Sequence, residues 1–320
     1  MPLIDMPLEE LRSYAGRNPK PADFDRYWDE SLAEMRAIDP KIELIPYDIG
    51  SNSADLFHLY FTGVGGARVH AQYLRPKHAT GKHPAVVRFH GYNWFSGDWQ
   101  EKLMWTSQGY SVAALDVRGQ CGLSQDVGGT RGRTSGGHFI HGMDDDDPKK
   151  MLFRSVFLDT AQLANIVMQM PEVDPDRVGV HGGSQGGALT LACAALEPRV
   201  KKAAAHHPFL SDYQRVWEMD LAVAAYQELK DYFRWFDPAH EREAAIFERL
   251  GYIDIQHLAP RIRGEVWMGC GLMDTICPPS SQFAAFNKIA APKQVVIWPD
   301  YGHEVPPGGH DAVFRFLSDL

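Results

Sequence analysis

Long apolar runs, excess positive charge and an N-terminal signal are all missing from this sequence of 320 residues. Because no run of about 18 apolar residues occurs, we expect no membrane-spanning helix. The net charge is -9, and this acidic balance argues against nucleic acid and against a membrane surface as partners. Met1 to Leu11 lacks the basic start and the apolar centre of a secretory signal.

Cysteine is scarce as well. The four cysteines form no C-x-x-C pair: Cys121, Cys193, Cys270 and Cys277. Cys270 and Cys277 are near enough in sequence to meet in space, but the pattern favours free thiols. Reduced cysteines and the missing signal together predict a cytoplasmic protein.

The sequence does contain ample material for a core, since 44% of its residues are hydrophobic. Aromatic residues make up 11% and include 8 Trp. Such a content suits a site that stacks on sugar rings or on other flat apolar faces.

The most informative stretch is Gly182-Gly183-Ser184-Gln185-Gly186, which fits the nucleophile elbow G-x-S-x-G. The strand-like run Arg177 to Val180 precedes it, and the helix former Ala188 to Leu196 follows it, which is the context that the motif requires. Glycine allows the tight turn, and the start of the helix aims N–H groups at a developing oxyanion. The alternative is a structural turn, but the context favours a nucleophilic Ser184.

Strand and helix patterns alternate from residue 83 onward, which predicts an α/β fold with a mostly parallel, doubly wound sheet. The expected strands are Pro84–His90, Tyr110–Val117, Arg177–Val180, Val200–His206, Glu265–Cys270 and Gln294–Trp298. The expected helices between and after them include Trp99–Gln108, Met151–Met170, Ser280–Ala290 and Ala312–Leu320. Three alternating runs upstream predict antiparallel first strands at Lys41–Ile49, Asp55–Thr62 and Ala67–Leu74.

We expect one domain over residues 1–320, with three additions to the sheet. Residues 1–40 form an arm whose helix spans Ala22 to Ile38. Residues 119–150 form a long loop, and such loops are usually functional or interfacial. Residues 211–262 form a helical insertion over the edge of the sheet where ligands bind. Most of its aromatic side chains should pack in the insertion's own core, with one or two facing the site.

A serine needs an adjacent base, and in this fold the partners follow in the order Ser, Asp or Glu, then His. Asp274 stands just after the strand that begins at Glu265, and it is favoured over Asp300, which is too near the histidine to come from a separate strand end. His303 follows the last strand and precedes the terminal helix. We therefore predict a triad in which Asp274 orients His303 and His303 activates Ser184.

An oxyanion hole requires two backbone N–H groups. The first should come from Gln185, the residue after the nucleophile, and the second from the loop after the early buried strand. That loop begins at His90-Gly91-Tyr92, and we assign the N–H of Tyr92.

Asp144 to Asp147, with His138 and His141 nearby, could suggest a metal site. The spacing fits no recognised ligand pattern, so a solvated loop before the helix at Met151 is favoured, and neither metal nor cofactor is expected. His206 and His207 follow a strand at the active edge, where either could line the pocket or be a satisfied polar residue.

Taken together, these motifs make the chain resemble the acetyl xylan esterase and cephalosporin-C deacetylase family, carbohydrate esterase family 7. The resemblance runs over nearly the whole chain and rests on Pro21–Asp25, His90-Gly-Tyr-Asn93, Arg118-Gly-Gln120, Gly182-Gly-Ser-Gln-Gly186, Gly271-Leu-Met-Asp274 and His303-Glu304. It implies removal of acetyl groups from short acetylated xylo-oligosaccharides and cephalosporin C, without a metal. It also implies a cytoplasmic trimer of dimers in which the loop after Gln120 supplies subunit contacts.

Two stretches depart from that family's pattern near the expected pocket. Trp94-Phe95-Ser96-Gly97-Asp98 is bulkier than a glycine-rich run, and His206-His207-Pro208-Phe209 replaces an acidic or small residue before the proline. We expect the pocket to include Trp94, His207, Pro208 and Phe209. The sequence thus predicts a serine esterase for acetyl esters. Two alternatives stay open: a hydrolase of the same fold for other acyl esters or peptides, and a non-catalytic binding protein on this scaffold.

Overall fold

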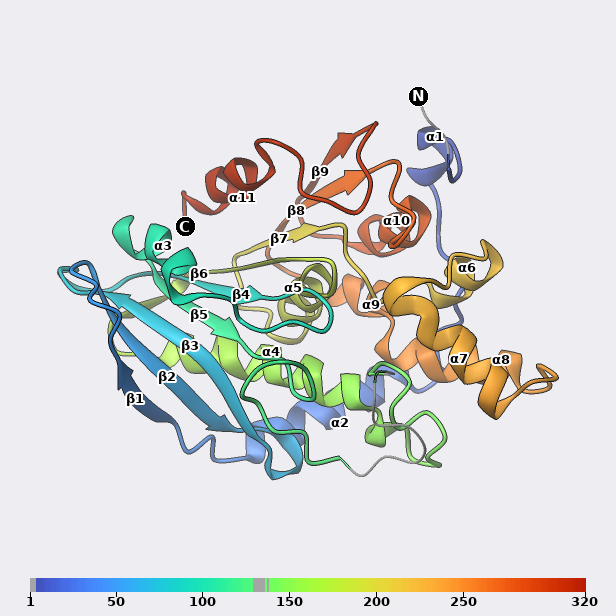
Figure 1. The fold of residues 1–320 in the computed structure, drawn as a ribbon, viewed down its shortest axis with the longest axis horizontal. Helices are drawn as coiled ribbons and strands as arrows, with labels where there is room; N and C mark the ends of the chain where they lie inside the picture. Colours follow the sequence, from blue (N-terminus) through green and yellow to red (C-terminus); the bar gives the residue numbers. More distant parts are fainter. Residues whose placement is uncertain (1–3, 129–135, 137) are drawn as a thin grey trace.

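The computed structural model describes residues 4–128, 136 and 138–320, and it is built on one nine-stranded sheet (Figure 1). The strands lie in the order β1-β2-β3-β5-β4-β6-β7-β8-β9. Their bounds are Glu43–Tyr47 (β1), Ala54–Thr62 (β2), Arg68–Pro76 (β3), His83–Phe89 (β4), Ser111–Leu115 (β5), Val173–Gly183 (β6), Lys202–His206 (β7), Glu265–Gly271 (β8) and Lys293–Trp298 (β9).

The sheet is antiparallel at its start and parallel in the rest, as predicted. β1, β2, β3 and β5 pair in antiparallel fashion along the sheet, and every pair from β5 through β4 to β9 is parallel. The carboxyl ends of the parallel strands therefore meet at one edge, where loops from several strands can build a site.

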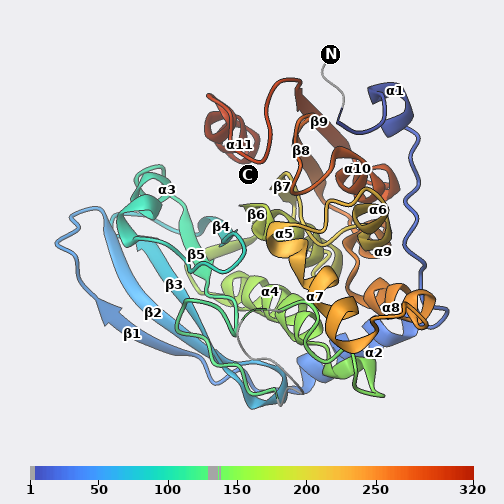
Figure 2. The same ribbon diagram turned by 45° about the vertical axis from the view of Figure 1, so that its right-hand side comes forward.

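Helices cover both faces of the sheet because alternate residues of its central strands are buried on opposite sides. Ala85 and Val87 of β4 belong to the larger core cluster, whereas Val86 belongs to the smaller one. The larger core is covered by α4, α5 and α10, and the smaller core by α3 and α11 (Figures 1 and 2). Their bounds are Leu103–Ser107 (α3), Leu152–Gln169 (α4), Gln185–Leu196 (α5), Pro279–Lys288 (α10) and Gly309–Leu317 (α11). This is the doubly wound arrangement of an α/β-hydrolase fold.

The N-terminal arm packs along the body of the molecule. It contains α1, Leu8–Leu11, and α2, Phe24–Ala37, which lies within the predicted helix. Phe24 and Trp28 are fully buried, and the Trp28 indole N–H donates to the Tyr252 carbonyl at 3.0 Å.

The predicted insertion is helical, with α6 at Tyr213–Glu218, α7 at Gln227–Phe236, α8 at Glu243–Leu250 and α9 at Ile255–Leu258. Its aromatic side chains pack mainly on one another: the rings of Trp217 and Phe233 lie 4.5 Å apart. Trp235 points to solvent with 72% exposure.

Over the residues that the structure describes, the connections contain six 3-10 turns. They are Val64–Gly66, Trp99–Lys102, Pro148–Lys150, Ala224–Tyr226, Gly251–Ile253 and Ala259–Arg261. The one at Trp99–Lys102 replaces the first turn of the single helix predicted over 99–108. Residues 129–135 and 137 of the predicted long loop lie outside the described residues. Over the part that the structure describes, none of the helices has the length and apolar character needed to cross a bilayer.

Candidate active site

Ser184 stands at a sharp turn between β6 and α5. Its backbone angles, φ 58° and ψ -120°, are rare for a residue with a side chain and indicate local strain. The turn is possible because its neighbours lack a Cβ: one added to Gly182 would lie 2.6 Å from the Phe89 carbonyl oxygen, and one added to Gly186 would lie 2.2 Å from it. These close approaches explain the two glycines of the motif.

The three residues predicted as a triad come together from three strand ends. Ser184 follows β6, Asp274 follows β8 and His303 follows β9. The His303 Nε2 atom lies 2.9 Å from the Ser184 Oγ, and its Nδ1 lies 2.9 Å from the Asp274 Oδ2. The partner of the histidine is thus Asp274, the residue favoured over Asp300.

Backbone donors fix the orientation of the Asp274 carboxylate, which is fully buried. Its Oδ1 accepts hydrogen bonds from the N–H groups of Ile276 at 2.9 Å and Cys277 at 2.8 Å. Its Oδ2 faces His303 and also lies 3.4 Å from the Gln282 amide nitrogen. Since an ionised carboxylate only accepts, Nδ1 of His303 carries a proton, and Nε2 is left to accept the proton of Ser184.

A second histidine lies beside His303. The rings of His207 and His303 have centroids 4.4 Å apart, and the His207 backbone adopts a left-handed φ of 29°. Burial lowers the pKa of His207 to about 2, and the neighbouring His303 and His206 contribute to the shift. His207 is therefore neutral at neutral pH and does not compete with His303 for a proton.

The two backbone N–H groups predicted to form the oxyanion hole are those of Gln185 and Tyr92. Gln185 opens α5, and Tyr92 lies in the loop after β4. Within the described residues, neither amide donates a hydrogen bond to the protein. Unoccupied N–H groups at a helix start are suited to receive an anionic oxygen.

The side chain of Gln185 joins these two parts of the site. Its Oε1 accepts from the Gln120 amide at 2.6 Å, and its Nε2 lies 3.1 Å from the Gln120 Oε1. That same Gln120 oxygen accepts the N–H of Asn93 at 2.9 Å, one residue beyond Tyr92. The fully buried Gln185 side chain therefore ties the elbow to the loop that carries the second N–H.

Arg118 anchors the start of the same loop. Its guanidinium makes two hydrogen bonds of 2.6 Å to the Asp159 carboxylate on α4, and it also donates to the Val64 carbonyl. Burial raises the pKa of Asp159, and the guanidinium opposes that shift. The sequence pattern Arg118-Gly119-Gln120 thus holds a loop in place and takes no direct part in the chemistry.

A cavity of about 750 Å³ opens above Ser184. Trp94 and His207 line it as predicted, and Trp94 is 58% exposed. Phe95 and Glu304, which stand in stretches that the sequence analysis had singled out, also line it, and so do Met104, Trp105 and Val305, which the sequence did not suggest. Met104, Trp105 and Val305 come from a helix and a loop in which no sequence motif marks a binding residue.

Two pocket predictions are wrong for this cavity. Pro208 and Phe209 do not line it, because the chain turns inward and the Phe209 ring is fully buried against Tyr226, with centroids 4.3 Å apart. The expectation that one or two aromatic residues of the insertion face the site is also not met here, since no residue of 211–250 lines this cavity.

The Asp144–Asp147 run serves the protein's own structure, in agreement with the interpretation as a loop. Asp144 accepts from Tyr232 and Arg242, and Asp147 caps the N–H of Lys149. Across residues 4–128, 136 and 138–320, the group of donors with metal-like spacing is His207, Asp274 and His303, within 4.8 Å of one another. Two of these three already hydrogen bond to each other in the triad.

Comparison with known proteins identifies the family of the chain. The model of the acetyl xylan esterase family matches residues 1–320. The chain belongs to the acetyl xylan esterase family. Its structure superposes on acetyl xylan esterase 1 from Thermoanaerobacterium sp. JW/SL YS485 with a TM-score of 0.97, at 59% identity and 99% coverage of both chains. The acetyl xylan esterase from Paenibacillus sp. R4 gives a TM-score of 0.92, at 35% identity over 98% of this chain and 100% of that one.

The chain is also similar to a curated protein, the acetyl esterase Axe7A from Xylanibacter ruminicola. It is 28% identical over 303 residues, which are 92% of this chain and 65% of the relative. The chain thus spans somewhat less than two thirds of that protein. The family match and the two solved esterases indicate a carboxylic ester hydrolase and support acetyl xylan esterase activity.

Proposed function

We propose that this chain is a serine esterase that removes acetyl groups from acetylated xylo-oligosaccharides and from small acetyl esters such as cephalosporin C. The observation that carries the proposal is the hydrogen-bonded series Ser184, His303, Asp274 at the floor of an open cavity. Family membership supplies the acetyl ester as the substrate class.

In the proposed first step, His303 takes the Ser184 proton on Nε2 while Oγ attacks the acetyl carbonyl carbon. The carbonyl oxygen becomes an oxyanion and receives the N–H groups of Gln185 and Tyr92. The His303 imidazolium then gives its proton to the departing alcohol, and acetyl-Ser184 remains. Asp274 stabilises the imidazolium throughout.

In the second step, water enters the place that the alcohol has left. His303 takes a proton from it, and hydroxide oxygen attacks the acetyl carbon. The tetrahedral intermediate collapses, Ser184 regains its proton from His303 and acetate departs. Trp94 and His207, which line the cavity, are proposed to contact the substrate.

Replacing Ser184 with Ala tests the proposal. The Ser184→Ala protein should fold normally and lose kcat on 4-nitrophenyl acetate by roughly 10⁶-fold, because no other hydroxyl takes the place of the nucleophile. Ser318→Ala is a matched control, since Ser318 is an exposed serine in the last turn of the chain. Retained hydrolysis in Ser184→Ala would remove this serine from the mechanism.

Two alternatives are separated by further measurements. A preference for acyl groups longer than propionyl, in a chain-length series of esters, would favour a different acyl hydrolase. Failure of Ser184 to react with a fluorophosphonate probe would favour a non-catalytic binding protein.

We further propose a cytoplasmic location and a homo-oligomer, with no nucleic acid or membrane partner. Four free thiols and the net charge of -9 support the first and last of these. The oligomer, a trimer of dimers, rests on the resemblance to carbohydrate esterase family 7.

A further inference from the structure

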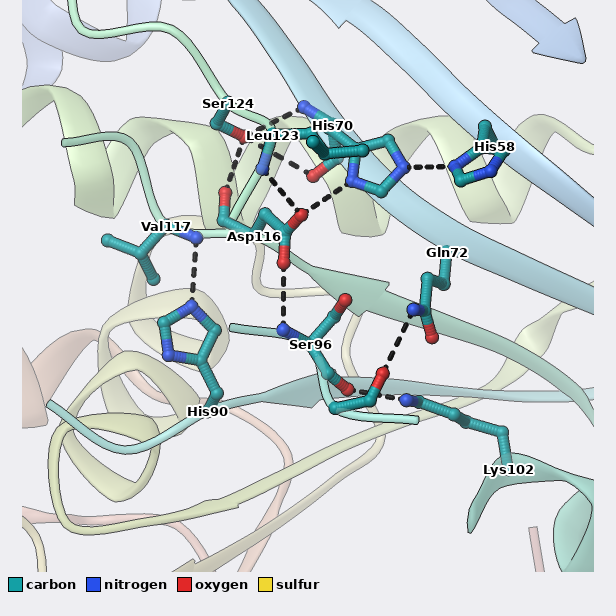
Figure 3. A network of polar contacts seen from close by, with 11 residues as sticks. His58, His70, Gln72, His90, Ser96, Lys102, Asp116, Val117, Leu123 and Ser124 are labelled. Carbon is teal, nitrogen blue, oxygen red and sulfur yellow. Dashed lines mark hydrogen bonds and ion pairs between the residues drawn. The ribbon is translucent and has the colours of Figure 1, made fainter. Parts of the chain in front are cut away.

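Buried charged side chains hold the backbone of residues 94–98, which we call the wall segment. This segment leaves β4 and lines the cavity through Trp94, Phe95 and Gly97. The Ser96 N–H donates to the Asp116 Oδ1 at 2.7 Å, and the Lys102 ammonium donates to the carbonyls of Ser96 at 2.5 Å and Asp98 at 2.8 Å (Figure 3). The two peptide groups on either side of the Ser96 Cα are therefore both held, the first by the Asp116 carboxylate and the second by the Lys102 side chain.

A third side chain, that of Gln72, also holds the wall segment. The Gln72 Nε2, from strand β3, donates to the Gly97 carbonyl at 2.9 Å. Gln72 is only 6% exposed, and its Oε1 is buried without a hydrogen-bond partner among the described residues. An unpaired buried oxygen costs free energy, so stability alone does not account for a glutamine at this position.

Burying the side chain of Lys102 also costs free energy. Its side chain is fully buried, and burial lowers its pKa to about 7, with Arg88 adding to the shift. A lysine is rarely buried so completely unless it is paired, and Lys102 has two backbone carbonyls of the wall segment as its partners.

The Asp116 carboxylate is itself held firmly. Its Oδ2 accepts from the Leu123 N–H at 2.9 Å and faces the His70 Nδ1 at 2.6 Å. On the far side of the ring, the His70 Nε2 lies 2.9 Å from the His58 Nδ1 (Figure 3). The series reaches back through β3 and β2, so the anchor of the wall segment is part of the rigid sheet.

We propose that Gln72, Lys102 and Asp116 are positioning residues for substrate selection: they hold the wall segment so that the Trp94 indole is fixed beside the alcohol portion of the bound ester. None of the three lines the cavity, whereas Trp94 does. The inference rests on the proposed esterase function, and it concerns which acetyl esters are bound, not how the bond is broken.

The test compares two acetates that differ only in the alcohol: ethyl acetate and fully acetylated xylobiose, with acetic acid release measured by titration. Gln72→Met keeps the side-chain length and removes both the donor to Gly97 and the unpaired oxygen. We expect its unfolding midpoint to stay the same or rise. The KM for acetylated xylobiose should rise about fivefold, the worth of one hydrogen bond. The kcat values for both esters and the KM for ethyl acetate should stay unchanged.

Gln162→Met is a closely matched control. Gln162 on α4 also donates through Nε2 to a backbone carbonyl, that of Thr62 at 2.9 Å, and its Oε1 is likewise buried and unpaired within the described chain. It does not line the cavity. Gln162→Met should leave both KM values unchanged.

A double variant decides whether the effect passes through Trp94. In a Trp94→Ala background, Gln72→Met should produce no further rise in the KM for acetylated xylobiose. An equal rise in that background, or an unchanged ratio of the two KM values in Gln72→Met, would overturn the inference. If the unsubstituted protein releases acetic acid from neither ester, it is the proposed function that fails.

Discussion

The buried carboxylate of Asp274 is the least exposed member of the triad and the one with the most hydrogen-bond partners. Two backbone N–H groups occupy Oδ1, and His303 faces Oδ2. Such a group sets which nitrogen of the histidine holds the proton. Its role is thus to prepare the base before any substrate arrives.

Asp274→Asn tests that role. The amide can donate to Nδ1 of His303, which would then hold its proton on Nε2 and be unable to accept one from Ser184. We expect kcat/KM on 4-nitrophenyl acetate to fall by about 10⁴-fold. Asp300→Asn, at an exposed position near the same loop, should leave it unchanged. A loss of activity in Asp300→Asn alone would instead favour the alternative acid.

Among single residues, those that could be predicted from the sequence are the ones whose place follows from the order of the strands. Ser184, Asp274 and His303 each follow a recognisable strand, and parallel strands end at one edge, so their meeting could be predicted. Gln72 and Lys102 could not, because each sits where a solvent-facing polar residue is expected: Gln72 in an alternating strand, and Lys102 directly after Gln100 and Glu101. Their contacts depend on side-chain packing between segments distant in sequence. Phe209 was misplaced because strand spacing does not show which way a ring turns once the strand has ended.

Among the elements, strands β3 and β5 and the loops after β4 and β5 meet at Asp116. Burial alone would raise the pKa of Asp116, but hydrogen bonds from His70, Leu123 and Ser96 outweigh burial and lower it from 3.8 to about 2. The ionised form is thus more stable in the folded protein than in the unfolded chain. This contribution, about 2 kcal/mol, is complete above pH 4 or so and is lost as the pH falls through 2.

Asp116→Asn should therefore lower the free energy of unfolding at pH 7 by at least about 2 kcal/mol. The difference from the unsubstituted protein should shrink as the pH is lowered from about 5 toward 3, because the native carboxylate then loses its advantage. Denaturant unfolding across this range measures both effects. Asp48→Asn is the control: Asp48 is exposed and accepts a single N–H from Gly50. A difference that stays constant with pH would mean that Asp116 acts by shape alone.

Element boundaries show why some strands were easier to predict than others. The buried run at β4 was predicted within a residue at each end, because apolar residues fill it. β6 begins at Val173, four residues before the predicted start at Arg177. The residues that follow Val173 are Asp174, Pro175, Asp176 and Arg177, and the register with β4 shifts between His83 and Ala85. An irregular strand start of this kind carries no apolar pattern.

At the scale of the whole molecule, the edge of the sheet at β1 exposes several large apolar side chains. All five residues of β1 are exposed, and Leu44, Ile45 and Tyr47 are among them. Natural proteins usually protect an edge strand of this composition. The exposure is compatible with the proposed homo-oligomer, in which part of the surface would be covered.

Light scattering after size-exclusion chromatography measures the mass directly. The proposal predicts a particle of about six times the 35.9 kDa chain, as a trimer of dimers requires. The mass should not change on moderate dilution, since assembly is proposed to be the resting state. A particle of one chain at all concentrations would contradict the oligomer and leave the triad untouched.

The paired amides of Gln120 and Gln185 constrain how this esterase can change over generations. Each side chain satisfies the other, and Gln120 also receives the Asn93 N–H. A substitution at either position leaves a polar group of the partner side chain without its hydrogen bond, next to the nucleophile. Neither residue can therefore be substituted alone without a loss of free energy. We therefore expect single substitutions at either position to lower activity more than a substitution that changes both residues together. Laboratory evolution of new specificity should therefore vary the wall segment and keep this pair fixed.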